Sequence, residues 1–334
     1  MDRWIAVDWG TSSFRAYLIK ENVVSDTIET NDGMKFVKDN NFENTFINLI
    51  EKWLVDDKKI DVLASGMVGA RQGWIEAPYE KAPCNLNNIN YISPVLFDNR
   101  ISIKIFSGIS QNDPPDVMRG EETQIAGFLT NNDDFKGSIC LPGTHSKWIK
   151  INKNSLEKFR TFMTGELFEI ISKNSVLSHS MKSDDLDKAE ILNSANKIMN
   201  KPELFANALF QLRADDLINS NGAIIYRSRL SGYLLAMELI GSLEFWKNND
   251  IVLIGNIDLI ELYENVLIKK VSSIQKFNSK DMVLKGLQYF KDKLVRLILA
   301  VKSRLFSVVQ IEVNAPVDKI IFRPRMPGLT NSEC

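Results

Sequence analysis

One short pattern occurs twice in this chain, and this repeat limits its fold more strongly than any other feature. In each copy an apolar strand runs into a turn that contains Gly-Thr, and a second strand follows. The turns are Gly10-Thr11-Ser12-Ser13 and Pro142-Gly143-Thr144-His145, and a third strand after each pair is typical of an antiparallel meander. The strands are expected over residues 4–7, 15–19, 23–28, 138–141, 147–151 and 156–162. The pattern predicts an α/β protein with two related halves.

The remaining segments alternate between apolar runs and helical spacing, which supports this α/β assignment. Polar residues at 131–134 separate the halves, and we expect domains over 1–132 and 133–290 with a tail over 291–334. Helices are expected over 42–54, 121–129, most of 165–242 and 258–269. Further strands are expected over 61–67, 101–106 and 251–254. Irregular structure is expected over 69–83, and a loop over 113–116.

Composition excludes several classes of protein. A chain of 334 residues with 44% hydrophobic and 25% charged residues is an ordinary globular protein, and its net charge of -1 argues against a dedicated nucleic-acid binder. Its beginning does not resemble a secretory signal, and no apolar run is long enough to cross a bilayer. The three widely spaced cysteines predict neither a zinc site nor a disulfide framework. We expect a cytoplasmic protein without a membrane or nucleic-acid partner.

The first Gly-Thr turn has the features of a phosphate site. Asp8 ends a buried strand, Gly10 permits a tight turn, and Thr11 and Ser12 offer N–H and O–H donors. Asp8 would coordinate Mg²⁺, and Arg15 would pair with a terminal phosphate. The alternative is a plain hairpin in which Asp8 caps the turn.

The second turn offers the same donors from the other half of the chain. Gly143 and Thr144 repeat the first motif, and Lys147 adds a positive charge. Two such turns would hold a polyphosphate from both sides. The alternative is a second plain hairpin with a surface lysine and a structural His145.

Two adjacent acids begin the helix expected over 121–129. One reading is electrostatic, because negative charge at a helix N-terminus interacts favourably with the helix dipole. The other makes one acid a general base beside Arg119. Adjacent helical residues point about 100° apart, so only one of them faces a given cleft. We prefer Glu121, which follows Gly120 directly, and keep Glu122 as the alternate.

Three weaker motifs add candidate binding residues. The segment 65–74 suits a polar ligand, with Arg71 for a carboxylate, although Trp74 is as readily explained as a core residue. In the segment 162–168, Thr164 is expected to cap a helix and Glu166 to occupy its first turn. A strand that ends at Gly255-Asn256 would allow a flat ring to approach the backbone.

Taken together, these motifs resemble the 2-dehydro-3-deoxygalactonokinase family. The resemblance runs in order from residue 4 to about 287 and rests on five motifs. They are Asp8-Trp9-Gly10-Thr11, the loop 66–79, Met118-Arg119-Gly120-Glu121-Glu122-Thr123-Gln124, Pro142-Gly143-Thr144-His145-Ser146-Lys147-Trp148 and Met163-Thr164-Gly165-Glu166-Leu167.

The resemblance implies two ribonuclease-H-like domains of the actin-like ATPase superfamily, with the active site between them. It implies a carbohydrate kinase that uses ATP and Mg²⁺ to phosphorylate 2-dehydro-3-deoxy-D-galactonate at its 6-hydroxyl. The implied roles are catalysis by Glu121 (alternate Glu122) and Asp8, with Asp8 also holding the metal. Nucleotide contacts fall on Gly10, Thr11, Ser12, Arg15, Gly143, Thr144, Lys147, Gly255 and Asn256, and substrate contacts on Gly69, Arg71, Gln72, Trp74, Arg119, Thr164 and Glu166.

Two rival functions and the tail stay open at this point. The chain would equally suit a related kinase for another sugar or sugar acid, or a nucleotide-dependent binding module. The family pattern ends soon after 281–287, whereas here a basic segment follows, with eight Lys/Arg and four Asp/Glu from residue 291 onward. Residues 294–309 have helical spacing, and packing on the second domain or self-association, for instance as a homodimer, are its candidate roles.

Overall fold

Two six-stranded sheets form the framework of the protein, which we describe from a computed structural model of residues 3–54 and 58–313, with side chains described up to residue 300. Residues Met1–Tyr289 form one compact unit, and a second unit begins at Phe290. The first sheet contains β1 Arg3–Trp9, β2 Phe14–Lys20, β3 Val23–Thr30, β4 Ile60–Ser65, β7 Tyr91–Ile92 and β8 Ile101–Phe106. The second contains β6 Cys84–Asn85, β11 Lys136–Leu141, β12 Ser146–Asn152, β13 Ser155–Phe162, β14 Asp250–Gly255 and β15 Ser273–Asn278.

The two sheets share one topology. The strand order β3-β2-β1-β4-β8 in the first corresponds to β13-β12-β11-β14-β15 in the second. In both, the first three strands are antiparallel neighbours and the last two continue parallel to the central strand. The predicted repeat of strand, Gly-Thr turn and strand is therefore confirmed, and it extends to five strands, the arrangement of a ribonuclease-H-like domain.

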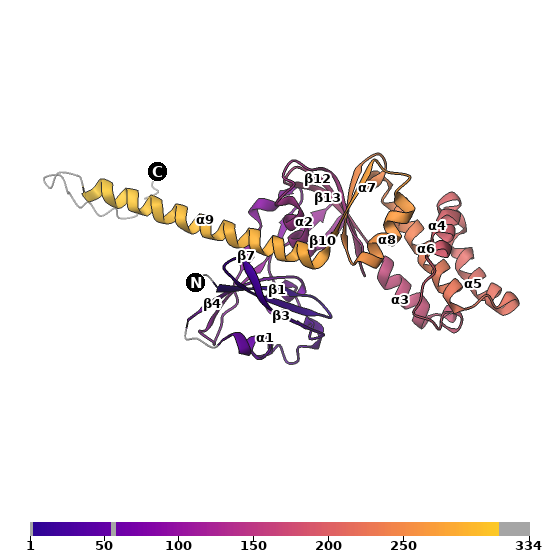
Figure 1. Cartoon of the computed structure of the whole chain (residues 1–334), viewed down its shortest axis with the longest axis horizontal. Helices are drawn as coiled ribbons and strands as arrows, with labels where there is room; N and C mark the ends of the chain where they lie inside the picture. Colours follow the sequence, from indigo (N-terminus) through magenta and orange to yellow (C-terminus); the bar gives the residue numbers. More distant parts are fainter. Residues whose placement is uncertain (1–2, 55–57, 314–334) are drawn as a thin grey trace, which may run out of the picture. The chain divides into compact units, whose positions relative to one another are not determined.

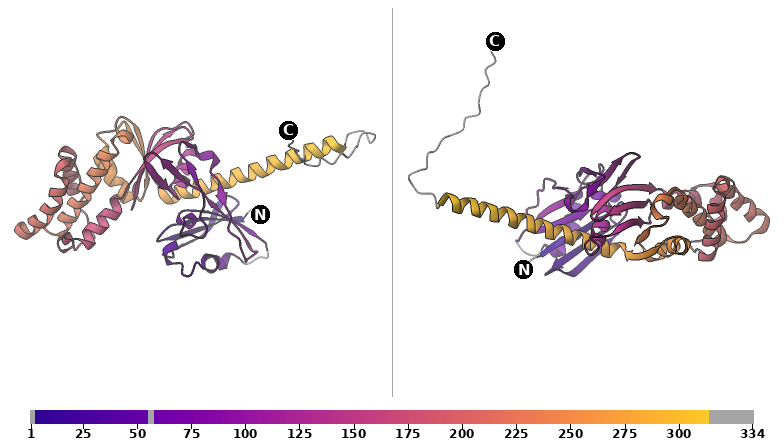
Figure 2. Two further views of the ribbon diagram at one scale, coloured as in Figure 1. Left: turned by 180° about the vertical axis from the view of Figure 1, so that it is seen from behind. Right: turned by 90° about the horizontal axis from the view of Figure 1, so that it is seen from above.

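Helices cover these sheets and also form a separate helical region. They are α1 Phe42–Ile50, α2 Glu121–Leu129, α3 Thr164–Asn174, α4 Lys188–Asn200, α5 Phe205–Asn219, α6 Ala223–Gly241, α7 Leu243–Trp246, α8 Ile257–Leu267 and α9 Ser279–Val313. The helices α4, α5 and α6 lie side by side (Figures 1 and 2). The predicted helical stretch of the second half is confirmed.

Two segments that we expected to be irregular contain short strands. The strand β5 Tyr79–Lys81 pairs with β9 Gly108–Asn112, and β9 pairs with β10 Pro115–Met118 in a separate three-stranded sheet. Pro115 is tolerated because it is the first residue of an edge strand, where its missing N–H costs little. The prediction of a loop over 113–116 is therefore wrong for residues 115–116, which begin β10.

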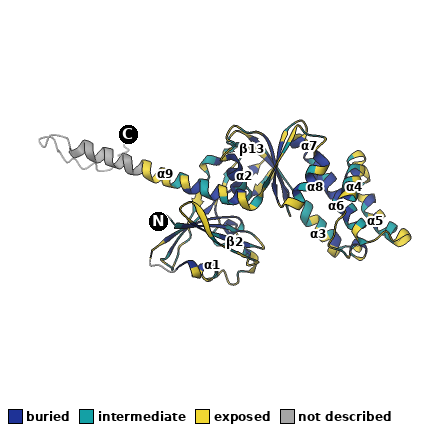
Figure 3. Ribbon diagram, viewed as in Figure 1, coloured by how far each residue is buried: buried dark blue, intermediate teal, exposed yellow. Residues whose placement is uncertain are grey.

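The apolar strand residues form the cores that hold the turns in place. Ile5, Val7 and Trp9 of β1 are fully buried under α1, and Ile139, Leu141 and other strand residues fill the core of the second sheet. Figure 3 shows β11, β12 and β14 of the second sheet as mostly buried, whereas the residues of α5 are mostly exposed or half-buried. Each Gly-Thr turn thus follows a strand whose position is fixed by its core.

The helices α2 and α9 make close contact within the compact unit through two glycines. A Cβ atom on Gly127 would lie 2.0 Å from the carbonyl oxygen of Met282, and one on Gly286 would lie 2.0 Å from that of Thr123. Since no side chain fits there, the two helix backbones touch directly. This contact fixes the position of α2, which begins with the two candidate acids.

The helix expected over 294–309 is confirmed as part of α9. In the second compact unit Leu297 and Ile298 have exposed fractions of 63% and 53%. Along the described parts of the chain, none of the helices is both long and apolar enough to traverse a lipid bilayer. The proposed domain boundaries at 132 and 290 stay predictions.

Candidate active site

Asp8 lies near the end of β1, and the first turn, which follows this strand, carries two exposed hydroxyl groups. Asp8 pairs in register with Arg15 of β2, and Arg15 Nη1 lies 3.2 Å from Asp8 Oδ2. The turn is closed by a hydrogen bond from Gly10 N–H to the Ser13 carbonyl, 2.9 Å long. Thr11 and Ser12 are exposed, and the described residues offer their hydroxyls no hydrogen-bond partner. These hydroxyls are available to a ligand.

Arg15 differs from the expectation that it binds a terminal phosphate. Its Nε donates to Glu29 at 2.9 Å while its Nη1 contacts Asp8, and Glu29 also receives Lys280 Nζ at 2.8 Å. A guanidinium already shared by two carboxylates positions those carboxylates more readily than it captures a third anion. Burial raises the pKa of Asp8, and Arg15 opposes that rise.

The two acids at the start of α2 point in different directions, as helix geometry predicts. Glu121 is partly exposed and accepts a hydrogen bond from Arg119 N–H at 2.9 Å. Its Oε1 lies 3.7 Å from Nζ of Lys147 on β12. Its charge also contributes to the raised pKa of Asp8, which places Glu121 near the end of β1. The Glu121 carboxylate at the start of α2 therefore lies close to β12 and near the end of β1.

Glu122 is fully buried, and this argues against its candidacy as the base. It accepts hydrogen bonds from Gly120 N–H at 2.7 Å and from the Thr123 hydroxyl at 3.2 Å. Gly120 has a φ of 104°, a conformation that glycine adopts without strain, and it lies against Gly66. Burial and the nearby Glu121 raise the pKa of Glu122 to about 8. In this buried position Glu122 holds the turn at Gly120 through its hydrogen bonds.

Replacing Glu122 by Gln should make the stability of the protein less dependent on pH. The folded protein holds the Glu122 proton up to a pKa of about 8, whereas the unfolded chain releases it near the ordinary value of 4.5. Between these values the folded state binds more protons, so wild-type stability falls as pH rises, by at most about 1.4 kcal/mol per pH unit. Urea midpoints measured from about pH 5 to about pH 8 should fall less steeply in Glu122→Gln.

A suitable control for this measurement is Glu169→Gln, because Glu169 is an exposed acid on α3 whose pKa is lowered by Lys173. Its charge does not change in the same pH range, so this variant should follow the wild-type slope. Equal slopes for wild type and Glu122→Gln would show that Glu122 is ionised in the folded protein.

The second turn is held by the start of α3. The carbonyl of Thr144 accepts a hydrogen bond from Glu166 N–H at 3.0 Å, and Gly165 packs so closely on the Gly143 carbonyl that a Cβ would lie 2.6 Å from it. The side of Gly143 where a Cβ would project is open. Lys147, next along the strand, is only 5% exposed. The turn thus presents its backbone and the Thr144 hydroxyl outward.

Glu166 occupies the first turn of α3, as predicted, whereas Thr164 has another partner than we expected. The Thr164 hydroxyl donates to Glu238 of α6 and does not cap α3, so the predicted N-cap role is wrong. The Glu166 carboxylate lies 2.5 Å from Nε2 of His145, which lies beside the second turn. Neither pairing could be predicted from residue spacing, because each joins different elements.

The loop over 66–79 places its predicted binding residues in two environments. Arg71 and Gln72 are exposed, and Arg71 pairs with Glu76 of the same loop at 3.4 Å. Trp74 packs against Trp9, Phe42 and Phe46, so its core interpretation is the one that the structure supports.

Arg119 lies beneath this loop and is buried. Its Nη2 donates to the Ala77 carbonyl at 2.7 Å, its guanidinium stacks 4.2 Å from the Tyr79 ring centre, and its Nη1 lies against Gly69. Its Nε and Nη1 have no partner among the described residues. In this arrangement Arg119 supports the loop, and Arg71 is the arginine that a ligand carboxylate can reach.

An apolar cavity of about 300 Å³ lies beside the second turn. Its walls combine the turn and α3 with apolar side chains of α6 and α8, and they include Gly143, Thr144, Phe168, Leu234, Leu262 and Tyr263. Asn256, by contrast, caps α8 by accepting a hydrogen bond from Asp258 N–H. Gly255 is buried, and a Cβ atom on it would lie 3.5 Å from the Pro142 carbonyl oxygen. The apolar surface suited to a flat ring is therefore this cavity.

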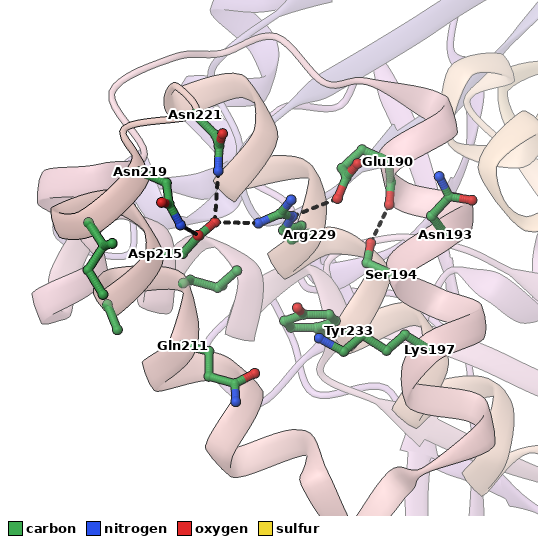
Figure 4. Close-up of a pocket in the computed structure, with 13 residues that line it drawn as sticks. Glu190, Asn193, Ser194, Lys197, Gln211, Asp215, Asn219, Asn221, Arg229 and Tyr233 are labelled. Atoms are coloured by element: carbon green, nitrogen blue, oxygen red, sulfur yellow. Dashed lines mark hydrogen bonds and ion pairs between the residues drawn. The ribbon is translucent and has the colours of Figure 1, made fainter.

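A larger, polar cavity of about 540 Å³ lies between α4, α5 and α6 and includes none of the predicted site residues. Figure 4 shows Arg229 between Glu190 and Asp215, with bonds of 2.6 and 2.7 Å. Asp215 also accepts from Asn219 and Asn221. Because these groups satisfy one another, their arrangement is explained without a ligand.

With this geometry established, the chain can be compared with known proteins. A family model described as 2-keto-3-deoxy-galactonokinase matches residues 8–290. The chain belongs to the 2-keto-3-deoxy-galactonokinase family. It is therefore a carbohydrate kinase by family, as the motifs indicated. The match to the 2-keto-3-deoxy-galactonokinase model ends where the second compact unit begins.

Two curated relatives and one solved structure agree with the 2-keto-3-deoxy-galactonokinase assignment. A probable 2-dehydro-3-deoxygalactonokinase of Rhizobium meliloti (strain 1021) is 34% identical over 291 residues, covering 85% of this chain and 95% of the relative. The 2-dehydro-3-deoxygalactonokinase of Escherichia coli (strain K12) is 28% identical over 239 residues, covering 71% and 79%. The crystal structure of a presumed 2-dehydro-3-deoxygalactonokinase from Sinorhizobium meliloti superposes with a TM-score of 0.79 at 33% identity, covering 85% and 97%. The predicted fold class is confirmed.

Proposed function

We propose that this kinase transfers the γ-phosphoryl group of ATP to the 6-hydroxyl of 2-dehydro-3-deoxy-D-galactonate. The observation that carries the proposal is the approach of Glu121 to Lys147, 3.7 Å apart. It brings an acid that can accept a proton next to a cation that can neutralise phosphate charge. Lys147 follows the second turn in the sequence, and Glu121 lies near Asp8, which precedes the first turn. Phosphoryl transfer depends mainly on such positioning and charge neutralisation.

Glu121 is the proposed general base. Its carboxylate is partly exposed, and Arg119 N–H fixes one of its oxygens at 2.9 Å. In this role it accepts the proton of the substrate hydroxyl as the oxygen attacks phosphorus. Lys147 stabilises the charge that develops on the phosphate oxygens, and its near-complete burial strengthens that interaction by excluding water.

The two turns are the proposed phosphate site, and the apolar cavity is the proposed site of the nucleotide base. Thr11, Ser12 and Thr144 present exposed hydroxyls, and the open side of Gly143 lets a ligand approach the backbone closely. The cavity adjoins this second turn, so a base inside it leaves its phosphates between the turns. This assignment replaces the expected base contacts at Gly255 and Asn256.

Asp8 fits the proposed role of holding Mg²⁺. Its carboxylate is 21% exposed at the end of β1 and lies near Glu121, and Mg²⁺ prefers one or two carboxylates together with water and phosphate oxygens. When bound there, the ion would neutralise phosphate charge. Arg15 holds Asp8 in place at 3.2 Å.

We propose that the substrate carboxylate binds at the exposed end of the 66–79 loop. Arg71 is the accessible cation there, and Gln72 lies next to it. Gly69 permits the close packing of Arg119 under the loop. Thr164 and Glu166 help to position the second turn, and Trp74 packs in the core of the first sheet.

A coupled ADP-release assay tests this function. The purified full chain should release ADP much faster when 2-dehydro-3-deoxygalactonate is added than with ATP alone. A panel of aldonic and 2-keto-3-deoxy acids should give lower kcat/KM values. Faster turnover with another acid would reassign the substrate within the sugar kinases. Equal ATP turnover with and without every acid would instead indicate a nucleotide-dependent binding module.

A further inference from the structure

A single buried acid lies behind the second turn and has no role in the mechanism described so far. Glu238 is 2% exposed in the last turn of α6, where its neighbours along the helix are mainly apolar. A buried carboxylate is strongly unfavourable unless several hydrogen bonds compensate it. Its partners should therefore reveal what keeps it there.

The partners of Glu238 come from three other elements. Its Oε1 accepts a hydrogen bond from Trp148 Nε1 on β12 at 2.8 Å. Its Oε2 accepts from the Tyr263 hydroxyl on α8 at 2.8 Å and from the Thr164 hydroxyl on α3. The Ser146 hydroxyl lies 3.0 Å from that of Tyr263, so it is connected to the carboxylate through Tyr263. Glu238 thus connects α6 to three elements that surround the second turn.

The contacts with Thr164, Ser146 and Tyr263 lead to proposed nucleotide-binding groups. Thr164 begins α3, whose next residues pack on Gly143 and bond to the Thr144 carbonyl. Ser146 Oγ lies at the edge of hydrogen-bond distance, 3.5 Å, from Gly143 N–H. Thr164 and Tyr263 also line the apolar cavity beside the turn. The carboxylate therefore holds both the turn and one wall of the cavity.

We propose that Glu238 is a positioning residue for the nucleotide: its buried carboxylate fixes Thr164, Ser146 and Tyr263, and thereby the second turn and the cavity wall. The inference rests on the proposed function, because it assigns the nucleotide to this cavity. Glu238 acts through its partners and does not touch the ligand. Its loss should weaken ATP binding while leaving the sugar-acid site and the general base Glu121 unchanged.

The variant Glu238→Gln tests this most directly. The amide keeps the size of the side chain but has one acceptor oxygen instead of two, so Trp148, Thr164 and Tyr263 can no longer all donate to it. We expect Kd and KM for ATP to rise about tenfold, the effect of losing one such hydrogen bond. The kcat value and the KM for the sugar acid should stay within about twofold, since Glu121 and Arg71 are not bonded to Glu238.

Two further variants keep the test informative if Glu238→Gln is unstable. Thr164→Val and Tyr263→Phe each remove one donor to the carboxylate while preserving most of the packing, and each should also raise the Kd for ATP. In the double variant Glu238→Gln/Thr164→Val the increase should be smaller than the product of the single effects, because both changes act on one interaction. Glu244→Gln is the matched control, since Glu244 is an acid on α7 that pairs with Lys158 and Arg160.

The outcomes separate the inference from the function on which it rests. A folded Glu238→Gln variant with wild-type Kd for ATP would overturn the inference while the kinase assignment stands. A fall in thermal stability without any change in Kd or KM for ATP would overturn it as well and indicate a purely structural role. A wild-type protein that binds no ATP would overturn the proposed function, and the inference with it.

Discussion

The variant Glu121→Gln should lower kcat by about 100- to 10,000-fold, the usual contribution of a general base. The amide cannot accept the proton of the substrate hydroxyl, although it retains the size of the side chain and can still accept the hydrogen bond from Arg119 N–H. The KM for ATP should change little, because Glu121 is not part of the proposed phosphate turns. Steady-state ADP release at saturating concentrations of both substrates measures the effect.

Two comparisons make this result specific to Glu121. Glu169→Gln removes an exposed acid on α3 and should keep wild-type turnover. Glu122→Gln should reduce turnover far less than Glu121→Gln, because the Glu122 side chain is fully buried and acts only on Gly120 and Thr123. A Glu121→Gln enzyme with near-normal kcat would contradict the assignment. A larger loss in Glu122→Gln than in Glu121→Gln would reverse the order of the two acids.

The variant Gly286→Ala should destabilise the protein by about 1–3 kcal/mol or more, although alanine favours a helix over glycine by about 1 kcal/mol. Its Cβ would lie 2.0 Å from the Thr123 carbonyl oxygen, which belongs to the backbone of α2 and has no rotamer to relieve the clash. The steric term therefore exceeds the gain in helix propensity. Urea denaturation monitored by circular dichroism measures the change.

The same contact predicts the behaviour of related variants. Gly127→Ala should have a similar effect, because its Cβ would lie 2.0 Å from the Met282 carbonyl oxygen. The double variant should lose less than the sum of the two single losses, since separating the helices once relieves both clashes. Lys285→Ala, at an exposed position of α9, is the control and should not be destabilised. Equal stability of Gly286→Ala and this control would contradict the close packing of α2 on α9.

The fold was largely predictable because its signals are local. Strand and helix periodicity, together with glycine in the turns, fixes the order of the elements over a few residues at a time. The helix predicted over 121–129 coincides with α2, and the repeated strand-turn-strand pattern extends to a shared five-strand topology. The short strands β5 and β10 were missed because their pairing with β9 depends on a third segment of the chain.

The candidate site was predictable in its motifs and only partly in its contacts. The sequence placed an acid after Gly120 and a lysine after the second turn, and their approach to 3.7 Å agrees with that placement. It gave no indication that Arg15 is shared by Asp8 and Glu29. Glu238 was missed altogether, although an isolated acid in an apolar stretch of helix was a signal that could have found it.

By itself, the sequence determined which elements form, where the two turns lie and which family the motifs resemble, since each depends on residues close together in the chain. Only the tertiary structure decided which acid faces outward, which arginine is accessible and which buried carboxylate holds the second turn. Such contacts join residues as far apart as Trp148 and Glu238, and their strength depends on burial, which exists only once the chain has folded.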